Sequence, residues 1–348
     1  MRVTVKDIAK IAGVTQPTVS KALNNEPGVS ERTRMRILTI AKELNYVPNL
    51  AAKRLVQRKS DCIGLVWPSA GGLFHFRLSQ EIQKEVTRRG YTFLISVADP
   101  AVAVHTFNDH FVDRILFWEG PGWVPSLDFI KEKESFQGKM VVMGGAKLEG
   151  AHRIQIDRQR GFYKAMKHLA ELGHRKVSYI GYLNDKYSGF MQGMVEFRME
   201  HHPDYFIRRD ERSGLESEAE LLAMLTRPKE ERVTAVIVDS QGTLFRVQRC
   251  FRQLGIRIPE DMSLISYDNI PEMTTLLEVP LTVIGPSIEH MVRTALDMLI
   301  GDDDTRHPVK GGEPEQEQLN EDGTFFWQNV VVEPELVIRQ STQPVAGS

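Results

Sequence analysis

The segment VKDIAKIAGVTQPTVSK, residues 5–21, contains two short helical patterns joined by a tight turn. In the first pattern, apolar residues recur at the i, i+3, i+4, i+7 spacing of one helical face. They lie between a capping box of Thr4 with Asp7 and a left-handed stop at Gly13. Thr15 is the expected N-cap of the second helix. Two short helices in this arrangement predict a helix-turn-helix.

The residues that follow can complete a small domain. Ser30 is placed to cap a third helix, in which Ile37, Ile40 and Ala41 share one face. Three helices of this length can close a small apolar core. We therefore predict an all-α head over residues 1–48.

The second helix is expected to turn its polar side chains outward. In a helix-turn-helix, this helix enters the major groove of DNA and contacts base edges with its N-terminal part. Gln16 can pair with adenine and Lys21 with guanine, each contact being worth ~1 to 3 kcal/mol of discrimination. The alternative is a plain helical hairpin with a polar surface. The head residues predicted to contact DNA are Thr4, Thr15, Gln16, Pro17, Thr18, Ser20, Lys21 and Asn24.

The charge of the chain is distributed unevenly. Residues 1–60 contain twelve Lys or Arg against four Asp or Glu, a balance of +8, whereas the rest of the chain carries −10. A basic head on an acidic body favours nucleic-acid binding, because neutralising phosphates releases counterions. Composition alone leaves a solvated basic face as an equal alternative.

The composition is that of a soluble globular protein. The 348 residues, 41% hydrophobic and 26% charged, predict two or three domains and exclude disordered and fibrous classes. No run of eighteen apolar residues and no secretory signal is present, so a cytoplasmic, nucleoid-associated location is expected. Cys62 and Cys250 lie too far apart in sequence to suggest a disulfide framework or a thiolate metal site.

The remainder of the chain alternates between strand and helix patterns. A helix is predicted over residues 78–89, and strand patterns are found at residues 62–67, 91–97, 114–118, 139–143, 176–180, 235–238 and 263–266. Such alternation predicts parallel sheets. The fold class is therefore α/β, with the small helical head joined to a doubly wound body of two lobes. Ligands of such folds bind outside the carboxyl ends of the strands.

Further motifs stand in a fixed order along nearly the whole chain. They are YVPN at 46–49, IGLV at 63–66, GHRKV at 173–177, PEDMS at 259–263, YD at 267–268, PLTV at 280–283 and PELVIR at 334–339. Together with the opening segment, this series resembles the LacI family of bacterial transcription regulators. The resemblance implies a periplasmic-binding-protein-like effector domain and a hinge helix that folds only on operator DNA.

The hinge position corresponds to LAAKRLV, residues 50–56, which has good helix formers but no complete apolar face. The resemblance implies that Leu55 enters the centre of the minor groove, where an apolar wedge kinks the duplex. Ala52 and Lys53 would face the groove beside it. Asn49 could contact phosphate or only cap the helix.

The effector is expected where loops follow strands. The predicted contact residues are Ser69, Phe74, Phe76, Trp118, Lys186, Phe190, Asp239, Gln241 and Asp268. Asp239 and Asp268 match family effector positions, whereas for any single aromatic residue a place in the core is as plausible as a ligand contact. Lys186 stands where relatives usually have arginine, and lysine offers a point charge in place of a planar fork. The resemblance therefore implies a sugar-like effector that differs from the commonest sugars.

The domain boundaries follow from these patterns. They are 1–48 for the head, 49–60 for the hinge helix and linker, and 61–342 for the effector-binding and dimerisation domain, with an N-lobe of about 61–157 and 286–301 and a C-lobe of about 158–281 and 324–342. Residues 302–323, with eight acidic and two basic residues, form an acidic insertion. A solvated loop is the simpler interpretation, and a partner contact or a shield beside the head is the other.

Two other functions are weighed against these patterns. An enzyme is not supported, because the chain lacks G-x-G-x-x-G, a P-loop, His-Glu-x-x-His and a nucleophile elbow. The alternative of a transport solute receptor conflicts with the predicted DNA head and the missing signal. The sequence thus predicts a homodimeric, ligand-responsive repressor of a palindromic operator. It is not an enzyme, and no cofactor or metal is expected.

Overall fold

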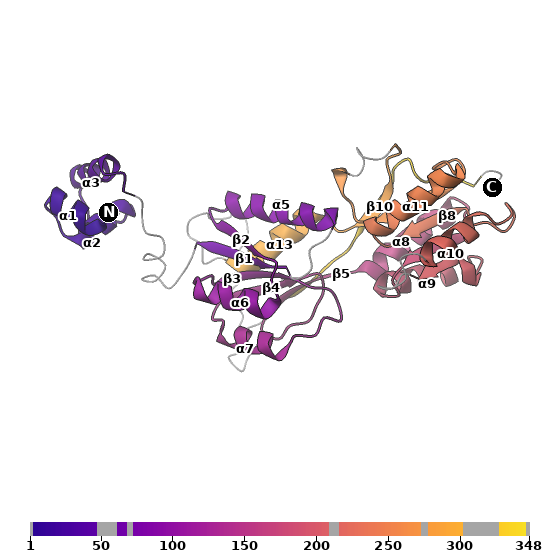
Figure 1. Cartoon of the computed structure of the whole chain (residues 1–348), viewed down its shortest axis with the longest axis horizontal. Helices are drawn as coiled ribbons and strands as arrows, with labels where there is room; N and C mark the ends of the chain where they lie inside the picture. The colour runs from indigo at the N-terminus through magenta and orange to yellow at the C-terminus, as the bar shows by residue number, and fades with distance from the viewer. Residues whose placement is uncertain are drawn as a thin grey trace. The chain divides into compact units, whose positions relative to one another are not determined.

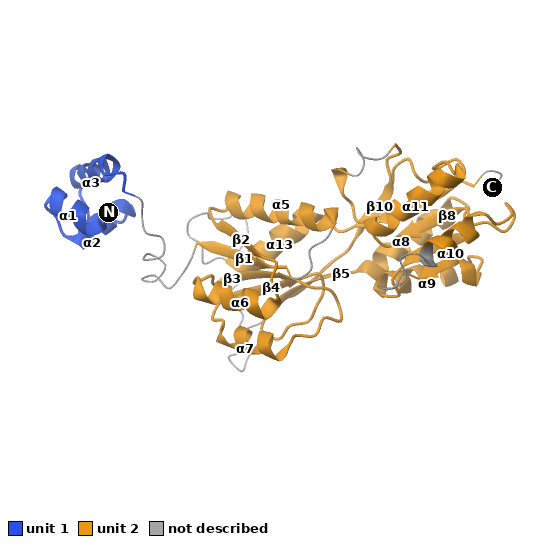
Figure 2. Cartoon of the chain, viewed as in Figure 1, with its two compact units in different colours: residues 1–60 blue, residues 61–348 orange. Residues whose placement is uncertain are grey.

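The computed structural model describes residues 3–46, 61–67, 72–208, 216–272, 278–301 and 327–345. The chain divides into two compact units, Met1–Ser60 and Asp61–Ser348, which we call the head and the body (Figure 2). Each has its own hydrophobic core among these residues. No helix in the described part of the chain is both long and apolar enough to cross a bilayer.

The head consists of three helices, α1 (Val5–Ala12), α2 (Gln16–Leu23) and α3 (Glu31–Glu43). Their starts and stops follow the predicted caps. Thr4 N–H donates to Asp7 Oδ2 at 2.9 Å, and Gly13 has the left-handed φ of +60°. Ser30 Oγ accepts from Thr33 N–H at the start of α3. The core contains Ile8, Val19 and Ile37, one from each helix, so all three helices are required to close it.

The first lobe of the body is built on a six-stranded parallel sheet of order β11-β5-β4-β3-β1-β2 (Figure 1). The strands are β1 (Cys62–Val66), β2 (Thr92–Ser96), β3 (Arg114–Trp118), β4 (Lys139–Met143), β5 (His152–Ile156) and β11 (Asn329–Val332), and the helices are α5 (Leu73–Arg88), α6 (Pro100–Asp109), α7 (Leu127–Ser135) and α13 (Ile288–Ile300). Alternate residues of β1 face opposite layers. Ile63 and Leu65 share a core with α5 and α13, whereas Cys62 and Val66 share one with α6 and α7.

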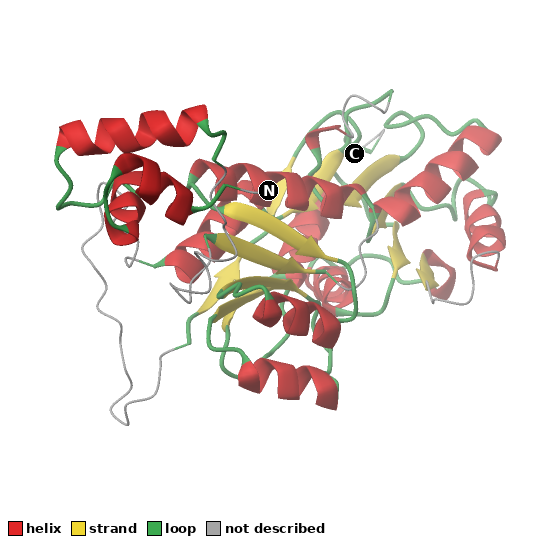
Figure 3. Cartoon of the chain, turned by 60° about the vertical axis from the view of Figure 1, so that its left-hand side comes forward, coloured by secondary structure: helices red, strands yellow, loops and turns green. Residues whose placement is uncertain are grey.

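The second lobe has a sheet of order β12-β10-β9-β8-β6-β7, parallel except for β12 against β10. In Figure 3 the strands of the body are yellow and its helices are red. Its strands are β6 (Val177–Gly181), β7 (Phe206–Arg208), β8 (Ala235–Val238), β9 (Ser263–Tyr267), β10 (Thr282–Gly285) and β12 (Glu335–Val337). Its helices are α8 (Arg158–Glu171), α9 (Asp185–Glu196), α10 (Glu216–Leu225), α11 (Gln241–Leu254) and the short 3-10 helix η1 (Pro203–Tyr205). The predicted α/β class is confirmed, with its ligand edge where the parallel strands end.

Two expectations need correction. Helix α5 begins at Leu73, five residues before the predicted helix, so Phe74 and Phe76 lie in a helix and not in a loop. Strand β11 falls in the segment expected to belong wholly to the C-lobe, yet it pairs with β5 of the first sheet. Without β11, β5 would be an edge strand with unpaired backbone N–H and C=O groups. These groups supply the hydrogen bonds that β11 needs.

Candidate DNA-contact surface and ligand cleft

Helix α2 presents a continuous polar surface. Gln16, Ser20 and Asn24 follow one another at four-residue spacing, and Pro17 and Lys21 form the adjacent row. All five are exposed, as are Thr4 and Thr15. Thr18 is half-buried, and its hydroxyl lies 2.9 Å from that of Thr15. The structure therefore brings the predicted α2 residues together on one helix, while Thr4 lies at the start of α1.

The opposite side of α2 is fixed by the head. Val19 and Ala22 are buried in the core. The loop to α3 is held by Arg34, which donates to Asn25 Oδ1 at 2.7 Å and to the Glu26 carbonyl at 2.8 Å. Because these contacts use only the inner face and the loop, the polar side chains of α2 are available to a partner.

Some predicted contact residues cannot be placed. Asn49, Ala52, Lys53 and Leu55 of the hinge, Ser69 after β1, and the acidic insertion 302–323 lie outside the described residues. Their predicted roles stay predictions.

The first lobe contributes an aromatic wall at the carboxyl ends of β1 and β3. Trp67 and Trp118 are stacked with ring centroids 6.5 Å apart. Phe74 contacts Trp118 at 5.4 Å, and His75 contacts Trp67 edge-on at 5.0 Å. Rings arranged in this way offer apolar faces together with polar edges. Phe74 and Trp118 were expected here, whereas Trp67 and His75 were not.

Two aromatic residues are not in this wall. Phe76 is 60% exposed, because two residues along a helix turn the side chain away from the face of Phe74. Phe190 is completely buried and packs against Tyr179 and Phe206 in the second-lobe core. The structure therefore does not bring Phe76 and Phe190 into the aromatic wall, and their contact with an effector stays a prediction.

The second lobe contributes a charged wall around Lys186 in the first turn of α9. Its Nζ donates to the Asp239 carbonyl at 2.7 Å and lies 3.8 Å from the centre of the Tyr267 ring. Burial lowers the pKa of this ammonium group, while the charges of Asp268 and Asp239 oppose that shift. Lys186 is thus held by a carbonyl dipole and a ring face in a partly desolvated place.

Asp239 has a mainly internal role. It is almost completely buried, and its carboxylate accepts from Tyr182 N–H at 2.9 Å and from the Thr243 hydroxyl at 2.9 Å. It therefore ties the loop after β6 to the first turn of α11. Gly181 leaves space for it, because a Cβ there would lie 2.3 Å from the carboxyl carbon.

Asp268 directly follows β9 and has a left-handed φ of +75°, which is uncommon for a residue other than glycine. Burial raises the pKa of its carboxyl group to about 6, against the opposing influence of Lys186 and Arg158. Strained backbone and a perturbed carboxyl group at a strand end are typical of functional positions.

Three buried polar atoms lack a hydrogen-bond partner in the described part of the chain. They are Trp67 Nε1, Gln241 Nε2 and Tyr267 Oη, although Arg158 is close enough to Tyr267 to oppose the rise that burial causes in its pKa. Each belongs to a residue at the end of a parallel strand or within three residues after it, where the fold places ligands. Leaving such a group unsatisfied costs about 1 to 3 kcal/mol, so a bound polar molecule is the natural source of the missing partners.

Arg158 connects the lobes beside this site. It begins α8, and it donates to the Gly144 carbonyl after β4 at 3.0 Å and to Asp185 Oδ2 at 3.4 Å. Arg158 and Tyr267 are not among the residues predicted from the sequence to contact the effector. Two features of the sequence could have indicated them. Arg158 is the first residue of the helix after β5, and Tyr267 is the last residue of the buried strand β9.

Comparison with known families agrees with this two-part organisation. Residues 4–49 match bacterial regulatory proteins of the lacI family, and residues 166–342 match the periplasmic binding protein-like domain. The chain belongs to the LacI family. Its relatives include the HTH-type transcriptional regulator DegA of Bacillus subtilis, 29% identical over 99% of both chains, and the HTH-type transcriptional repressor PurR of Haemophilus influenzae, 27% identical over 98% of this chain and 99% of that one.

Solved LacI-family structures share the fold. A lac repressor dimer bound to operator and the anti-inducer ONPF has a TM-score of 0.75 at 20% identity, and covers 99% of this chain and 100% of that one. A LacI-family regulator from Enterococcus faecium with bound ribose has a TM-score of 0.63 at 22% identity, over 82% of this chain and 99% of that one. The two curated relatives are named as a transcriptional regulator and a transcriptional repressor.

Proposed function

We propose that this LacI-family chain represses transcription by binding operator DNA through α2 and responds to a small ligand held between the two lobes of its body. The observation that carries the proposal is that one chain has two surfaces whose polar groups lack partners among the described residues. One is the exposed polar face of α2, and the other is a cleft with three unpaired buried polar atoms. Relatives named as a transcriptional regulator and a repressor support the same function.

The DNA contacts proposed for the head are those of the α2 face. Gln16 and Lys21 would read bases, and the neighbouring hydroxyl and amide groups would contact phosphates. Leu55 would be the minor-groove wedge, with Ala52 and Lys53 facing the groove beside it and Asn49 as a phosphate contact or a helix cap; residues 49–60 would be the hinge and linker.

The proposed ligand is a small sugar or sugar derivative. Its hydroxyl groups would satisfy Trp67 Nε1, Gln241 Nε2 and Tyr267 Oη, and the Asp268 carboxylate would accept from paired hydroxyls. The aromatic wall would cover its apolar ring face. Lys186 in place of a planar guanidinium supports a ligand with a single charged or strongly polar contact at this point.

The proposed assembly is a homodimer on a palindromic operator, because two-fold protein symmetry requires two-fold DNA symmetry. Strand β2 is at the edge of the first sheet, and it presents Ile95, 49% exposed, followed by Val97, 66% exposed. Exposed apolar residues on an edge strand are typical of a contact surface. Because the proposed partner is chromosomal DNA, we place the protein in the cytoplasm at the nucleoid.

The test selects palindromic duplexes from a random library with the full chain at low salt, and then measures retention of the selected duplex. Sugars, sugar acids and nucleobases are screened by thermal shift, and each compound that binds is added to the DNA assay. The proposal expects one palindrome to be enriched and its affinity to change at least tenfold with a sugar-class compound. Enrichment of no sequence would reject the repressor function.

A further inference from the structure

Helix α5 of the first lobe depends on the second lobe for its N-terminal cap. Its N-cap residue is Gly72, which has no side chain to offer, and it has a left-handed φ of +94°. The first N–H groups of a helix have no partner within the helix. Leu73 N–H instead donates to Gln241 Oε1 at 3.2 Å, and Gln241 is the first residue of α11 in the other lobe.

The NH₂ group of the same Gln241 amide, Nε2, lacks a hydrogen-bond partner among the described residues. Gln241 is 7% exposed. Trp67 Nε1, also unpartnered, belongs to a ring that contacts His75 in the first turn of α5. Two unpaired donors from opposite lobes therefore adjoin the start of α5, and a ligand oxygen is the acceptor that both lack.

The two ends of an amide cannot be exchanged without a penalty. If the Gln241 amide rotated by half a turn, its NH₂ group would face the Leu73 N–H and the cap would be lost. A ligand acceptor bound to Nε2 therefore favours the orientation that caps α5. This is a direct physical link between occupancy of the cleft and order at the start of a helix in the other lobe.

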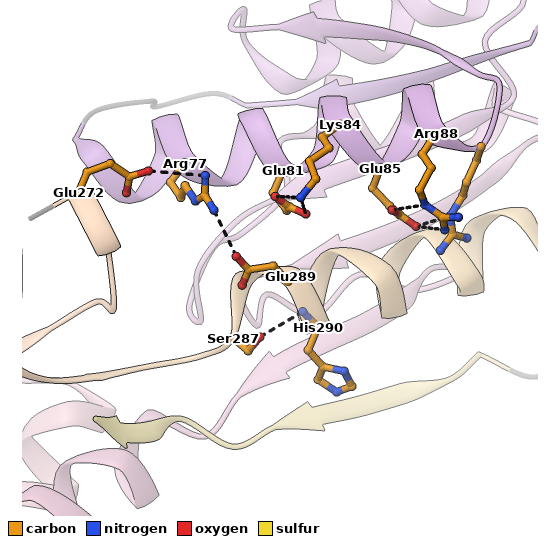
Figure 4. A network of polar contacts seen from close by, with 10 residues as sticks. Arg77, Glu81, Lys84, Glu85, Arg88, Glu272, Ser287, Glu289 and His290 are labelled. Carbon is orange, nitrogen blue, oxygen red and sulfur yellow. Dashed lines mark hydrogen bonds and ion pairs between the residues drawn. The ribbon is translucent and has the colours of Figure 1, made fainter. Parts of the chain in front are cut away.

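A second contact lies one turn further along α5 (Figure 4). Arg77 Nη1 lies 3.5 Å from Glu272 Oε1 of the second lobe, and Arg77 Nη2 lies 3.3 Å from Glu289 Oε1 of α13. Both carboxylates are about half exposed, so these ion pairs add little to the free energy that holds α5 against the second lobe. The hydrogen bond from Leu73 N–H to Gln241 is therefore the more important contact. A cavity of about 90 Å³ is lined by Arg77, Asn269 and Ser287, among other residues.

The far end of α5 reaches the first residue of the body. Tyr91 N–H donates to the Val86 carbonyl, and Thr92 N–H donates to the Asp61 carbonyl at 2.7 Å. Asp61 is the residue at which the body begins after the linker. The chain that follows α5 is therefore hydrogen-bonded to the residue at which the body begins.

We propose that Gln241 is a bifunctional ligand contact. Its Nε2 donates to an oxygen of the bound molecule, while its Oε1 caps α5 across the lobes, so that binding orders the first turn of α5. This inference rests on the proposed function only for the existence of the ligand. The ligand class it requires is an oxygen acceptor, either a hydroxyl group or a carboxylate, within reach of both Gln241 and Trp67.

Two substitutions separate the two ends of the amide. Gln241→Leu removes both, whereas Gln241→Glu keeps an oxygen for the Leu73 N–H and removes the donor. Gln253→Leu, on the exposed face of the same helix, is the matched control. Hydrogen exchange of the full chain, followed by mass spectrometry on a peptide covering residues 73–77, reports the first turn of α5. Without ligand we expect exchange to be roughly fivefold faster in Gln241→Leu, as for a lost helix cap, and unchanged in the other two.

The ligand arm uses ribose and cellobiose, together with any sugar that binds in the thermal-shift screen. A bound sugar should slow exchange of this peptide in the wild-type chain and leave it unchanged in Gln241→Glu. Equal exchange in Gln241→Leu and Gln253→Leu would overturn the cap, and a bound sugar without effect on the wild-type peptide would overturn the coupling. If no sugar and no sugar acid of the thermal-shift screen binds, the ligand class and the coupling both fail, whereas the variants still decide whether Gln241 caps α5.

Discussion

The head and the body keep their functional side chains in opposite environments. On α2, Gln16, Ser20 and Lys21 are exposed, with no described contact that depends on their side chains. In the body, Lys186 and Gln241 are bonded to the Asp239 carbonyl and the Leu73 N–H. The side chains on α2 are therefore free to bind a partner, whereas those in the cleft also stabilise the fold.

The difference follows from the two partners. DNA is large and charged, and a basic surface gains affinity from counterion release without being buried beforehand. A small ligand offers few atoms, so its site must be largely preformed and enclosed. Enclosure perturbs the site, as the lowered pKa of Lys186 and the raised pKa of Asp268 show. We therefore expect substitutions on α2 to change binding alone, and substitutions in the cleft to change binding and stability together.

The largest expected effect is that of removing residues 1–60. The body has its own cores, so the remaining chain should fold and bind its ligand, while its affinity for the selected operator falls by more than about a thousandfold. Gel retardation and thermal unfolding measure the two quantities. If the shortened chain still bound the operator specifically, the head would not be the DNA-binding part and the comparison would fail.

The next effect is that of Lys21→Ala on α2. Loss of one base contact should weaken operator binding roughly 5- to 100-fold and relax the preference at one base pair. The free energy of unfolding should stay within about 0.5 kcal/mol, because the side chain is exposed. Lys42→Ala on α3 removes the same charge elsewhere in the head and serves as the control. If both variants weaken binding equally at every sequence, Lys21 acts only through its charge.

Lys186→Met in the cleft is expected to have an effect of similar size, but on stability. Methionine removes the ammonium group from the Asp239 carbonyl and the Tyr267 ring, and leaves Asp268 with less neutralising charge. Breaking a partly buried cluster in this way should lower the free energy of unfolding by about 3 kcal/mol, measured with urea. Lys131→Met, an exposed lysine paired with Asp128, should change it by less than about 1 kcal/mol. If the two variants had equal free energies of unfolding, the cleft would tolerate substitution as well as α2 does.

The head could be predicted almost residue by residue, because caps and spacing act within one turn. Thr4, Gly13 and Ser30 have the predicted roles at the helix ends. In the body the buried strands were predictable from their apolar runs. Strand β11 was placed in the wrong lobe, since its partner β5 is nearly two hundred residues away in sequence.

The cleft was only partly predictable for the same reason. The position of Asp268 after β9 follows from local sequence, and so does that of Gln241 at the start of α11. Phe190 could not be assigned to the core without knowing that β7 brings Phe206 against it. The cap that Gln241 provides to α5 joins residues 168 positions apart, and no local pattern specifies it.

The last prediction concerns pH, and it separates two carboxyl groups of the same lobe. The folded-state pKa of Asp268 is raised to about 6 from 3.8, so the native state binds this proton more tightly than the unfolded chain does. Its contribution to stability is therefore greatest at low pH and is lost as pH rises from about 4 through 6. Because Asp268 is only half-buried, solvent screening reduces the corresponding free energy, and we expect about 1 to 2 kcal/mol, which Asp268→Asn should abolish.

Asp261 provides the opposite case. Its hydrogen bonds with Arg257 lower its pKa from 3.8 to about 2, so any contribution it makes is present above pH 4 and is lost as pH falls through 2. Because the pair is exposed, Asp261→Asn should leave the unfolding midpoint between pH 4 and 6 unchanged. Unfolding curves of both variants across this range measure the difference in slope. Identical slopes for Asp268→Asn and the wild-type chain would mean that the Asp268 carboxyl group is as well solvated as the side chains of α2, and the contrast between body and head would not extend to this residue.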